Sequence, residues 1–235
     1  DSGCADDVNK GWAQMANQIP VLLSAGLGVI PFTTTDISGY CGDIKDYPAM
    51  AELYTRWLQL GAFNPLSRIH HEGNNAVEPW LFGAEAEKNA KAAIELKYTL
   101  LPYIYTYARE AHDLGLPLMR PMVMEFPMDT ETYDLDAQFM FGEEILVAPV
   151  VKKSARTKNL YLPEGLWIDF NDKKTEYTGE QWLTVDAPLN LIPMFVRKGS
   201  IIPRMPMMNY TREHKVYPVT FEVFPAIEGE KAEFS

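Results

Sequence analysis

The fold is decided by the stretch PAMAELYTRWLQLGAFNPLSRIHHEGNN at residues 48–75. In its first half, apolar side chains recur at steps of three and four residues, at Met50, Leu53, Trp57 and Leu60. This spacing predicts a helix over 48–61 with one apolar face. The second half, 62–75, predicts a short strand that ends in a polar loop. Helix, strand and polar loop in this order are typical of parallel α/β folds.

The residues before this stretch show the same order of predicted helix, strand and polar loop. Residues 9–26 show the helical spacing again, and we expect Pro20 to bend this helix and Gly26 to end it. GVIPF at 28–32 is a short apolar run, which predicts a strand covered on both faces. A loop rich in glycine and small polar residues follows at 33–43, again at the end of a predicted strand.

The pattern changes after the next helix, which we predict over 84–114 with a kink at Pro102. Beyond residue 117 the chain holds only short strand-like runs, separated by proline, glycine and Asn-Asp turns: 144–151, 159–170, 180–185, 194–203 and 216–224. Such runs indicate an antiparallel β domain. We therefore predict the closing portion of a (β/α)8 barrel over 1–120, and an antiparallel β-sandwich over 121–235.

Composition narrows the classes of partner. The chain has 235 residues, of which 47% are hydrophobic, so it can bury a core. Its net charge of −11 argues against a nucleic-acid partner, because phosphate backbones are bound by clustered Lys and Arg. No apolar run reaches the roughly 18–20 residues of a membrane helix, so we expect no membrane partner either.

The N-terminus and the cysteines leave the cellular compartment open. The chain begins with Asp1 rather than Met and shows no signal peptide, so we interpret it as a piece of a longer protein. Cys4 and Cys41 are too few for a disulfide framework or a zinc site. We expect two free thiols, with a bond between the two cysteines as the alternative.

Three polar loops at predicted strand ends hold the residues that are suited to chemistry: Asp7, Asp36 and the group Arg68, His70 and His71. In a parallel barrel, the C-terminal ends of the strands meet at one rim, so these residues are expected to converge. Carboxylates and a histidine on one rim suit acid–base or glycosidic chemistry.

Each of these residues also has a purely structural interpretation. Asp7 stands just before a predicted helix and is suited to cap it. Asp36 lies in a loop where aspartate commonly forms a turn, and His70 and His71 are alternatively a surface pair. A metal site is not predicted, because the sequence has no HExxH or CxxC motif and no compelling carboxylate–histidine spacing.

Five longer segments resemble glycoside hydrolase family 31, the family of retaining α-glucosidases and α-xylosidases. They run in order through most of the chain: LYTRWLQLGAFNPLSRIHHEGNNAVEPWLFG (53–83), LKYTLLPYIYTYAREAHDLGLPLMRPMVMEFP (96–127), DAQFMFGEEILVAPVV (136–151), YLPEGLWIDF (161–170) and APLNLIPMFVRKGSIIP (187–203). The resemblance implies a catalytic (β/α)8 barrel followed by β domains. It implies no metal and no organic cofactor.

The resemblance also implies roles for five residues. Asp7 precedes a tryptophan by five positions, as the general acid/base does in the family. The family loop D-I-G-G-F corresponds to residues 36–40 and its R-x-H motif to residues 68–70. By that match, Asp36 and His70 hydrogen-bond hydroxyls of the terminal sugar, Tyr40 lines its pocket, and Arg68 orients the carboxylates.

Two departures from the family pattern surround the expected acid. Asp6 stands where the family has glycine, and it competes with Asp7 for the acid role. Cys4 replaces the tryptophan that normally lines the sugar pocket. The family nucleophile belongs to an earlier barrel strand with a W-x-D-M-N-like end, which we expect upstream of Asp1. The rest of this barrel is therefore an expected partner, and we expect the isolated piece to be inactive.

The resemblance implies exo-acting hydrolysis of a terminal α-glucoside or α-xyloside with retention. In that mechanism one carboxylate attacks the sugar while a second carboxyl, with a raised pKa, protonates the leaving oxygen. Two alternatives remain open: an α-glucan lyase on the same scaffold, and a non-catalytic sugar-binding homologue in which the altered residues 4–6 have broken the acid site. The sugar and the linkage are not specified by these residues.

Overall fold

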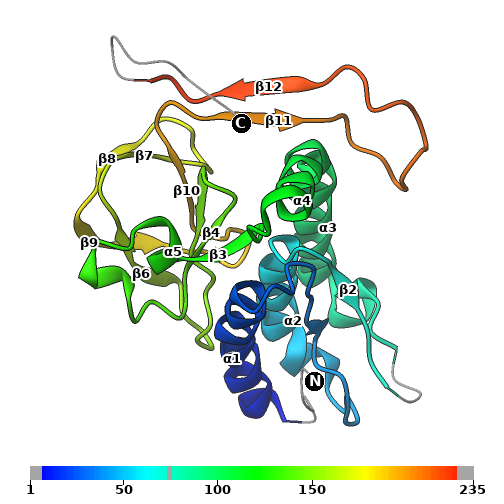
Figure 1. Cartoon of the computed structure of the whole chain (residues 1–235). Coiled ribbons are helices and arrows are strands. Elements are labelled where there is room, and N and C mark those ends of the chain that lie inside the picture. Colours follow the sequence, from blue (N-terminus) through cyan, green and yellow to red (C-terminus); the bar gives the residue numbers. More distant parts are fainter. Residues whose placement is uncertain (1–6, 73–75, 227–235) are drawn as a thin grey trace.

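The computed structural model describes residues 7–72 and 76–226 (Figure 1). In these residues the longer helices are α1 (Val8–Leu27), α2 (Tyr47–Ala62), α3 (Ala84–Thr99) and α4 (Leu101–Leu114). Single helical turns are η1 (Pro79–Phe82), α5 (Met122–Glu125) and η2 (Thr130–Thr132). Within the same ranges, no helix is long and apolar enough to cross a membrane.

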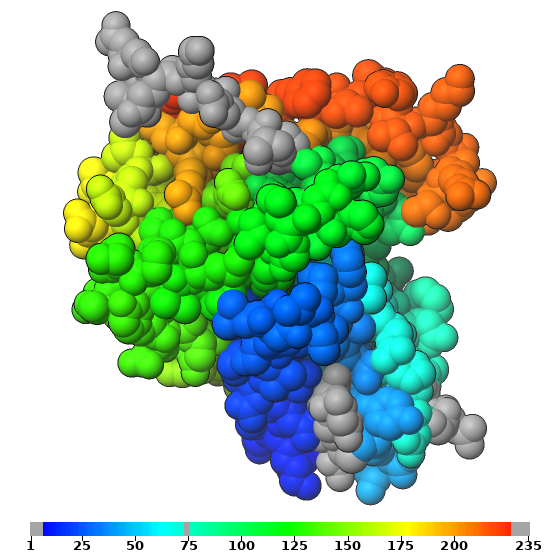
Figure 2. Space-filling view, viewed as in Figure 1, coloured from blue at the N-terminus to red at the C-terminus, as the bar shows by residue number. Residues whose placement is uncertain are grey.

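α1 and α2 confirm the helices predicted from the apolar spacing. Pro20 lies inside α1, and the helix ends at Leu27, one residue beyond the predicted stop at Gly26. Gly26 lies where α1 closely approaches the chain before β3 (Met119–Pro121): a Cβ at this position would lie 3.1 Å from Cβ of Pro117. Figure 2 shows α1, in blue, directly against the green part of the chain.

The helix predicted over 84–114 is two helices rather than one kinked helix. α3 and α4 meet at Leu100, and Pro102 lies in the first turn of α4. A first-turn N–H has no partner within its own helix, so proline leaves no helical hydrogen bond unmade there. At its other end, α4 is capped by Gly115 in the left-handed conformation, at φ 77°.

Two short parallel strands lie among these helices. β1 (Asp36–Ile37) pairs with β2 (Arg68–Ile69), so that Asp36 stands beside Arg68. The strand predicted over 28–32 is wrong, since the backbone there is irregular and its residues are mostly exposed. An apolar run forms a strand only where a neighbouring backbone completes its hydrogen bonds. In the described chain Asp36 and Ile37 have such a neighbour, the strand β2.

The second part of the chain is antiparallel, as predicted beyond residue 117. In the described residues, one sheet has the order β3, β4 (Phe139–Phe141), β5 (Ile145–Val147), β10 (Met194–Arg197), β7 (Leu166–Asp169) and β8 (Glu176–Thr178). Two smaller ladders are β6 (Thr157–Leu162) with β9 (Gln181–Asp186), and β11 (Ile201–Arg204) with β12 (Thr220–Val223). That these sheets form a sandwich stays a prediction.

The helices and the large sheet share one hydrophobic core. Leu53 and Trp57 of α2 and Phe139 and Phe141 of β4 are fully buried in the same cluster. The ring of Phe63, just after α2, meets that of Phe141 edge to face, with 5.2 Å between centroids. Burial of apolar surface across this contact is worth about 25 cal/mol per Å². The core therefore fixes α2, and the strand ends beside it, against the sheet.

Arg56 of α2 reinforces this contact with polar bonds. Its guanidinium is buried and donates to the carbonyl oxygens of Ala187, at 2.6 Å, and Leu191, at 2.7 Å. Gln59, one turn further on, donates to the carbonyl of Leu189 at 2.8 Å. Both side chains thus bind the backbone of the segment between β9 and β10.

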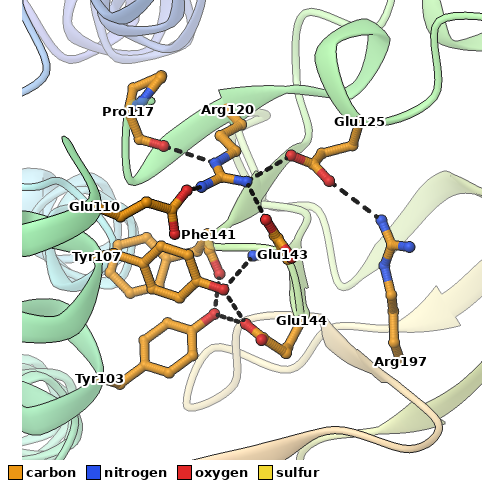
Figure 3. Close-up of polar contacts among 10 residues, drawn as sticks. All are labelled: Tyr103, Tyr107, Glu110, Pro117, Arg120, Glu125, Phe141, Glu143, Glu144 and Arg197. Atoms are coloured by element: carbon orange, nitrogen blue, oxygen red, sulfur yellow. Dashed lines mark hydrogen bonds and ion pairs between the residues drawn. The ribbon is translucent and has the colours of Figure 1, made fainter. Parts of the chain in front are cut away.

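A second polar junction joins α4 to the sheet (Figure 3). Arg120 of β3 is only 1% exposed and donates to Glu125 at 2.7 Å and to Glu143 at 3.2 Å. It also pairs with Glu110 of α4 and donates to the carbonyl of Pro117. One buried cation therefore neutralises carboxylates from three separate parts of the chain.

Candidate active site

Asp36 and Arg68 form the best-defined pair at the ends of the parallel strands. Asp36 is 8% exposed, and its Oδ1 accepts from Nε of Arg68 at 3.0 Å and also from the Nη2 group. The ladder register, which places these residues side by side, brings the two side chains together. A charge-assisted bond of this forked kind fixes a carboxylate in one orientation.

Tyr40 and His70 meet in the loops that follow these strands. Their rings stack with 5.5 Å between centroids and an interplanar angle of 29°. Both side chains are half-buried. Asp36, Tyr40, Arg68 and His70 therefore converge at one end of the two-stranded ladder, although up to 34 positions separate them in the sequence. The result is an aromatic wall beside a fixed carboxylate and an imidazole.

Asp7 lies at the start of α1 and caps it. Its Oδ1 accepts from the backbone N–H of Asn9 at 2.7 Å and of Lys10 at 3.2 Å. These bonds hold the pKa of Asp7 below its ordinary value, and the bond from Lys10 has the larger effect on the pKa. The raised pKa expected of a general acid is not found for this exposed side chain, because the two backbone hydrogen bonds stabilise its charged form, and the charges of Lys10 and Lys153 add to this effect.

The described contacts do not connect Asp7 with the other four residues. No hydrogen bond, ion pair or ring contact between described residues joins it to Asp36, Tyr40, Arg68 or His70. In Figure 1, however, the start of α1 lies at the same lower end of the helical part as the loops after β1 and β2. The capping interpretation of Asp7 is confirmed, and its catalytic role stays a proposal.

The expectation of free thiols is wrong for Cys41, which is in a disulfide. Sequence spacing gave no sign of it, because two cysteines 37 positions apart form no recognisable framework. Cys4 is the other cysteine of the sequence; it lies outside the described residues, as does Asp6.

His71 has a role that its sequence context did not reveal. Its two ring nitrogens lie 2.8 Å from the carbonyl oxygen of Gly39 and 2.7 Å from that of Gly42. It thus holds the loop that carries Tyr40, instead of pairing with His70 on the surface. The only signal in the sequence was its position beside His70, within a group of polar residues.

Side chains of the types in this cluster can recognise hydroxyl groups. A carboxylate accepts hydrogen bonds, and an imidazole ring can donate or accept them, which suits the vicinal hydroxyls of a sugar. An aromatic ring suits the apolar face of a sugar. Among the described residues, no group of three or more His, Cys, Asp or Glu side chains is placed to hold a metal ion.

Comparison with known families shows to which family the chain belongs. Residues 4–107 match the glycosyl hydrolases family 31 TIM-barrel domain, and residues 115–202 match the glycosyl hydrolase family 31 C-terminal domain. The chain belongs to glycoside hydrolase family 31. The resemblance seen in the five segments is thereby confirmed, and the cluster at the ends of β1 and β2 lies within the matched barrel domain.

Three similar proteins are glycosidases by name. A dextranase from Flavobacterium johnsoniae, solved with glucose, is 69% identical over 92% of this chain and superposes with a TM-score of 0.90. An α-xylosidase from Saccharolobus solfataricus is 36% identical over 95% of the chain, and the lysosomal α-glucosidase of Mus musculus is 32% identical over 95%. The chain spans 27%, 30% and 25% of these three proteins.

Proposed function

We propose that this chain is the closing part of the catalytic barrel, with the adjoining C-terminal domain, of a retaining exo-acting α-glycosidase. The observation that supports it best is the cluster at the ends of β1 and β2, where Arg68 fixes Asp36 and Tyr40 stacks on His70. In this proposal Asp36 and His70 bind hydroxyls of the terminal sugar, Tyr40 forms a wall of its pocket, and Arg68 orients Asp36.

The reaction takes place by double displacement. Asp7 protonates the departing glycosidic oxygen while a carboxylate from the upstream barrel attacks the sugar, and Asp7 then deprotonates the water that releases it. In retaining enzymes these two carboxyl groups lie about 5–5.5 Å apart. The nearby carboxylate of the complete barrel would raise the pKa of Asp7. Alone, without this nucleophile, the 235-residue chain is inactive.

For the sugar, the relatives favour glucose. The 69% identical neighbour is a dextranase solved with glucose, and a second structure of it holds isomaltotriose. We therefore propose an α-linked glucan or gluco-oligosaccharide as the substrate, in preference to an α-xyloside. Comparing turnover of isomaltotriose with that of an aryl α-xyloside tests this choice, and a preference for the xyloside contradicts it.

The acid assignment is tested by Asp7→Asn in the protein that carries the whole barrel. The substrate is an aryl α-glucoside with a poor leaving group, and we expect turnover to fall by about 10²–10⁴-fold. A strongly acidic phenol needs little protonation, so the loss should be much smaller with such a leaving group. Asp46→Asn is the matched control, because Asp46 caps α2 through the N–H of Ala49 but lies outside the cluster. Turnover of Asp7→Asn within a few-fold of the unmodified protein contradicts the assignment.

One observation favours a second function, that of a non-catalytic sugar-binding homologue. Asp7 is exposed, its pKa is lowered, and its carboxylate is engaged in capping α1. Sugar binding measured by calorimetry, without turnover of any α-glycoside, would support this alternative. Product analysis separates the hydrolase from a lyase, since a lyase releases an anhydro-sugar and a hydrolase releases a reducing sugar.

A further inference from the structure

The imidazole of His71 bridges two carbonyl groups of one loop. Nδ1 lies 2.8 Å from the oxygen of Gly39, and Nε2 lies 2.7 Å from that of Gly42. Carbonyl oxygens only accept, so each ring nitrogen needs a hydrogen to bond its partner. Each ring nitrogen of His71 thus faces a carbonyl oxygen of the same loop.

The bridged loop has a backbone that requires such support. Three of its residues have positive φ: Ser38 at 77°, Gly39 at 89° and Gly42 at 100°. For serine this conformation costs about 1–2 kcal/mol, and it persists only where the surroundings hold it. The backbone N–H of Glu72 adds a third tie, to the carbonyl of Tyr40 at 2.6 Å. Two successive residues after β2 therefore hold the loop on both sides of Tyr40.

The ring of Tyr40 is held by His70, which is the residue before His71 in the loop after β2. It stacks on His70, as described above, while His71 bonds the carbonyls that bracket Tyr40 in sequence. Residues 70–72 thus position the side chain and the backbone of Tyr40 together. Loss of the His71 bonds would free the backbone of Tyr40 to shift relative to Asp36 and His70.

We propose that His71 is a positioning residue for sugar binding, which fixes Tyr40 as a wall of the pocket by clamping the loop 39–42. The proposal rests on the proposed function, because it takes Tyr40 to contact the sugar. A pocket wall binds the sugar similarly in the ground state and in the transition state, so its displacement raises KM and leaves kcat largely unchanged.

The test compares His71→Leu, which removes both ring nitrogens, with His71→Gln, which keeps an amide donor. Both are measured in the protein that carries the whole barrel, without reductant, so that the disulfide of Cys41 stays intact. Each lost hydrogen bond should raise KM by about 2- to 10-fold, since such bonds contribute about 0.5–1.5 kcal/mol. We expect the larger rise for His71→Leu, with kcat within about twofold of the unmodified enzyme.

The matched control is His112→Gln. His112 is an exposed histidine of α4 whose Nδ1 lies 2.8 Å from Asp113, and it has no contact with the loop 39–42 among the described residues. Its replacement should change neither KM nor kcat. If His71→Leu does not fold, His71→Gln carries the comparison with this control.

A second measurement needs no activity: hydrogen–deuterium exchange of peptides covering residues 36–46. We expect faster exchange in both His71 variants, and exchange at α4 as in the unmodified protein. Unchanged KM and unchanged loop exchange would overturn the proposal. A fall in kcat at constant KM would also overturn it, because His71 would then act in the chemical step. If the parent protein turns over no α-glucoside, the proposed function fails, while loop exchange and calorimetric sugar binding still test the clamp.

Discussion

The hydroxyl of Tyr103 lies 2.7 Å from Oε2 of Glu144 and, at the same time, 2.6 Å from the carbonyl oxygen of Phe141 (Figure 3). The hydroxyl of Tyr107 lies 2.6 Å from the same carboxyl oxygen and accepts from the N–H of Glu143. Oε2 of Glu144 therefore accepts from both tyrosine hydroxyls within this buried junction.

Burial of Glu144 raises the pKa of its carboxyl group. Glu144 is 6% exposed, and burial is the main reason why its pKa lies above the ordinary value. Tyr103 and Tyr107 face it from α4, and Glu143 stands beside it. Of the nearby cations, Arg120 is bonded to the other carboxylates, and Arg197 of β10 pairs with Glu125 at 3.5 Å.

The first prediction concerns pH. A carboxyl whose pKa is raised on folding stabilises the protein below the ordinary value of 4.5, and this stability is lost as pH rises through the raised pKa. Glu144→Gln keeps a neutral group of the same shape, so it should remove this loss. We expect the thermal midpoint of the unmodified protein to fall relative to that of Glu144→Gln as pH rises above 4.5. Glu164→Gln, in an exposed turn, is the control; parallel curves for the unmodified protein and Glu144→Gln would contradict the assignment.

The second prediction concerns Arg120, the buried cation of the same junction. Arg120→Met leaves Glu110, Glu125 and Glu143 without their shared partner, and breaking a buried pair costs about 3–5 kcal/mol. Arg120→Lys should rescue little, because an ammonium does not reproduce the planar array of donors. Urea unfolding measures the effect.

The control for this prediction is Arg109→Met on α4. Arg109 is 71% exposed and pairs with Asp113, so its loss should cost no more than about 1 kcal/mol. Equal losses for Arg109→Met and Arg120→Met would show that the buried junction contributes no more than a surface ion pair does.

The third prediction separates backbone strain from crowding at two glycines. Gly115 has φ +77° and open space around it, so Gly115→Ala should cost only the left-handed conformation, about 1–2 kcal/mol. Gly142 has φ +65°, and a Cβ there would overlap the hydroxyl of Tyr103 and the ring of Tyr107. Gly142→Ala should therefore be clearly the more destabilising of the two in urea unfolding. A smaller effect at Gly142 would mean that the tyrosines move aside without loss.

α1 and α2 were predictable because their apolar spacing is long and regular. α1 buries one face, marked for example by Trp12, Met15 and Ile19, whereas α2 is buried on all sides from Leu53 to Ala62. β1 was not predictable, since two residues carry no periodicity, whereas β2 lies within the stretch 62–75 for which a short strand was predicted. The apolar run at 28–32 misled for the opposite reason: its composition suits a strand, but no neighbouring backbone completes it in the described chain.

The candidate site was predictable only in part. Asp36, Arg68 and His70 were found from their place in polar loops at predicted strand ends, and Tyr40 through the family resemblance; the ladder register places Asp36 beside Arg68. The bonds of His71 go to backbone carbonyls, which leave no trace in the residue types of the loop. The junction around Arg120 was equally hidden, because its partners are selected by tertiary packing.

The contacts of Arg56 have a consequence for exchanging parts between related enzymes. Its guanidinium recognises the path of the main chain at residues 187–191, through carbonyl groups that every amino acid possesses. The exposed side chains of Pro188 and Asn190 are therefore free to vary, unlike the fully buried Ala187, whereas an insertion or deletion would shift the carbonyls out of reach. A chimaera joined within residues 187–191 therefore has to keep the length of this segment, while the identity of its exposed residues can change.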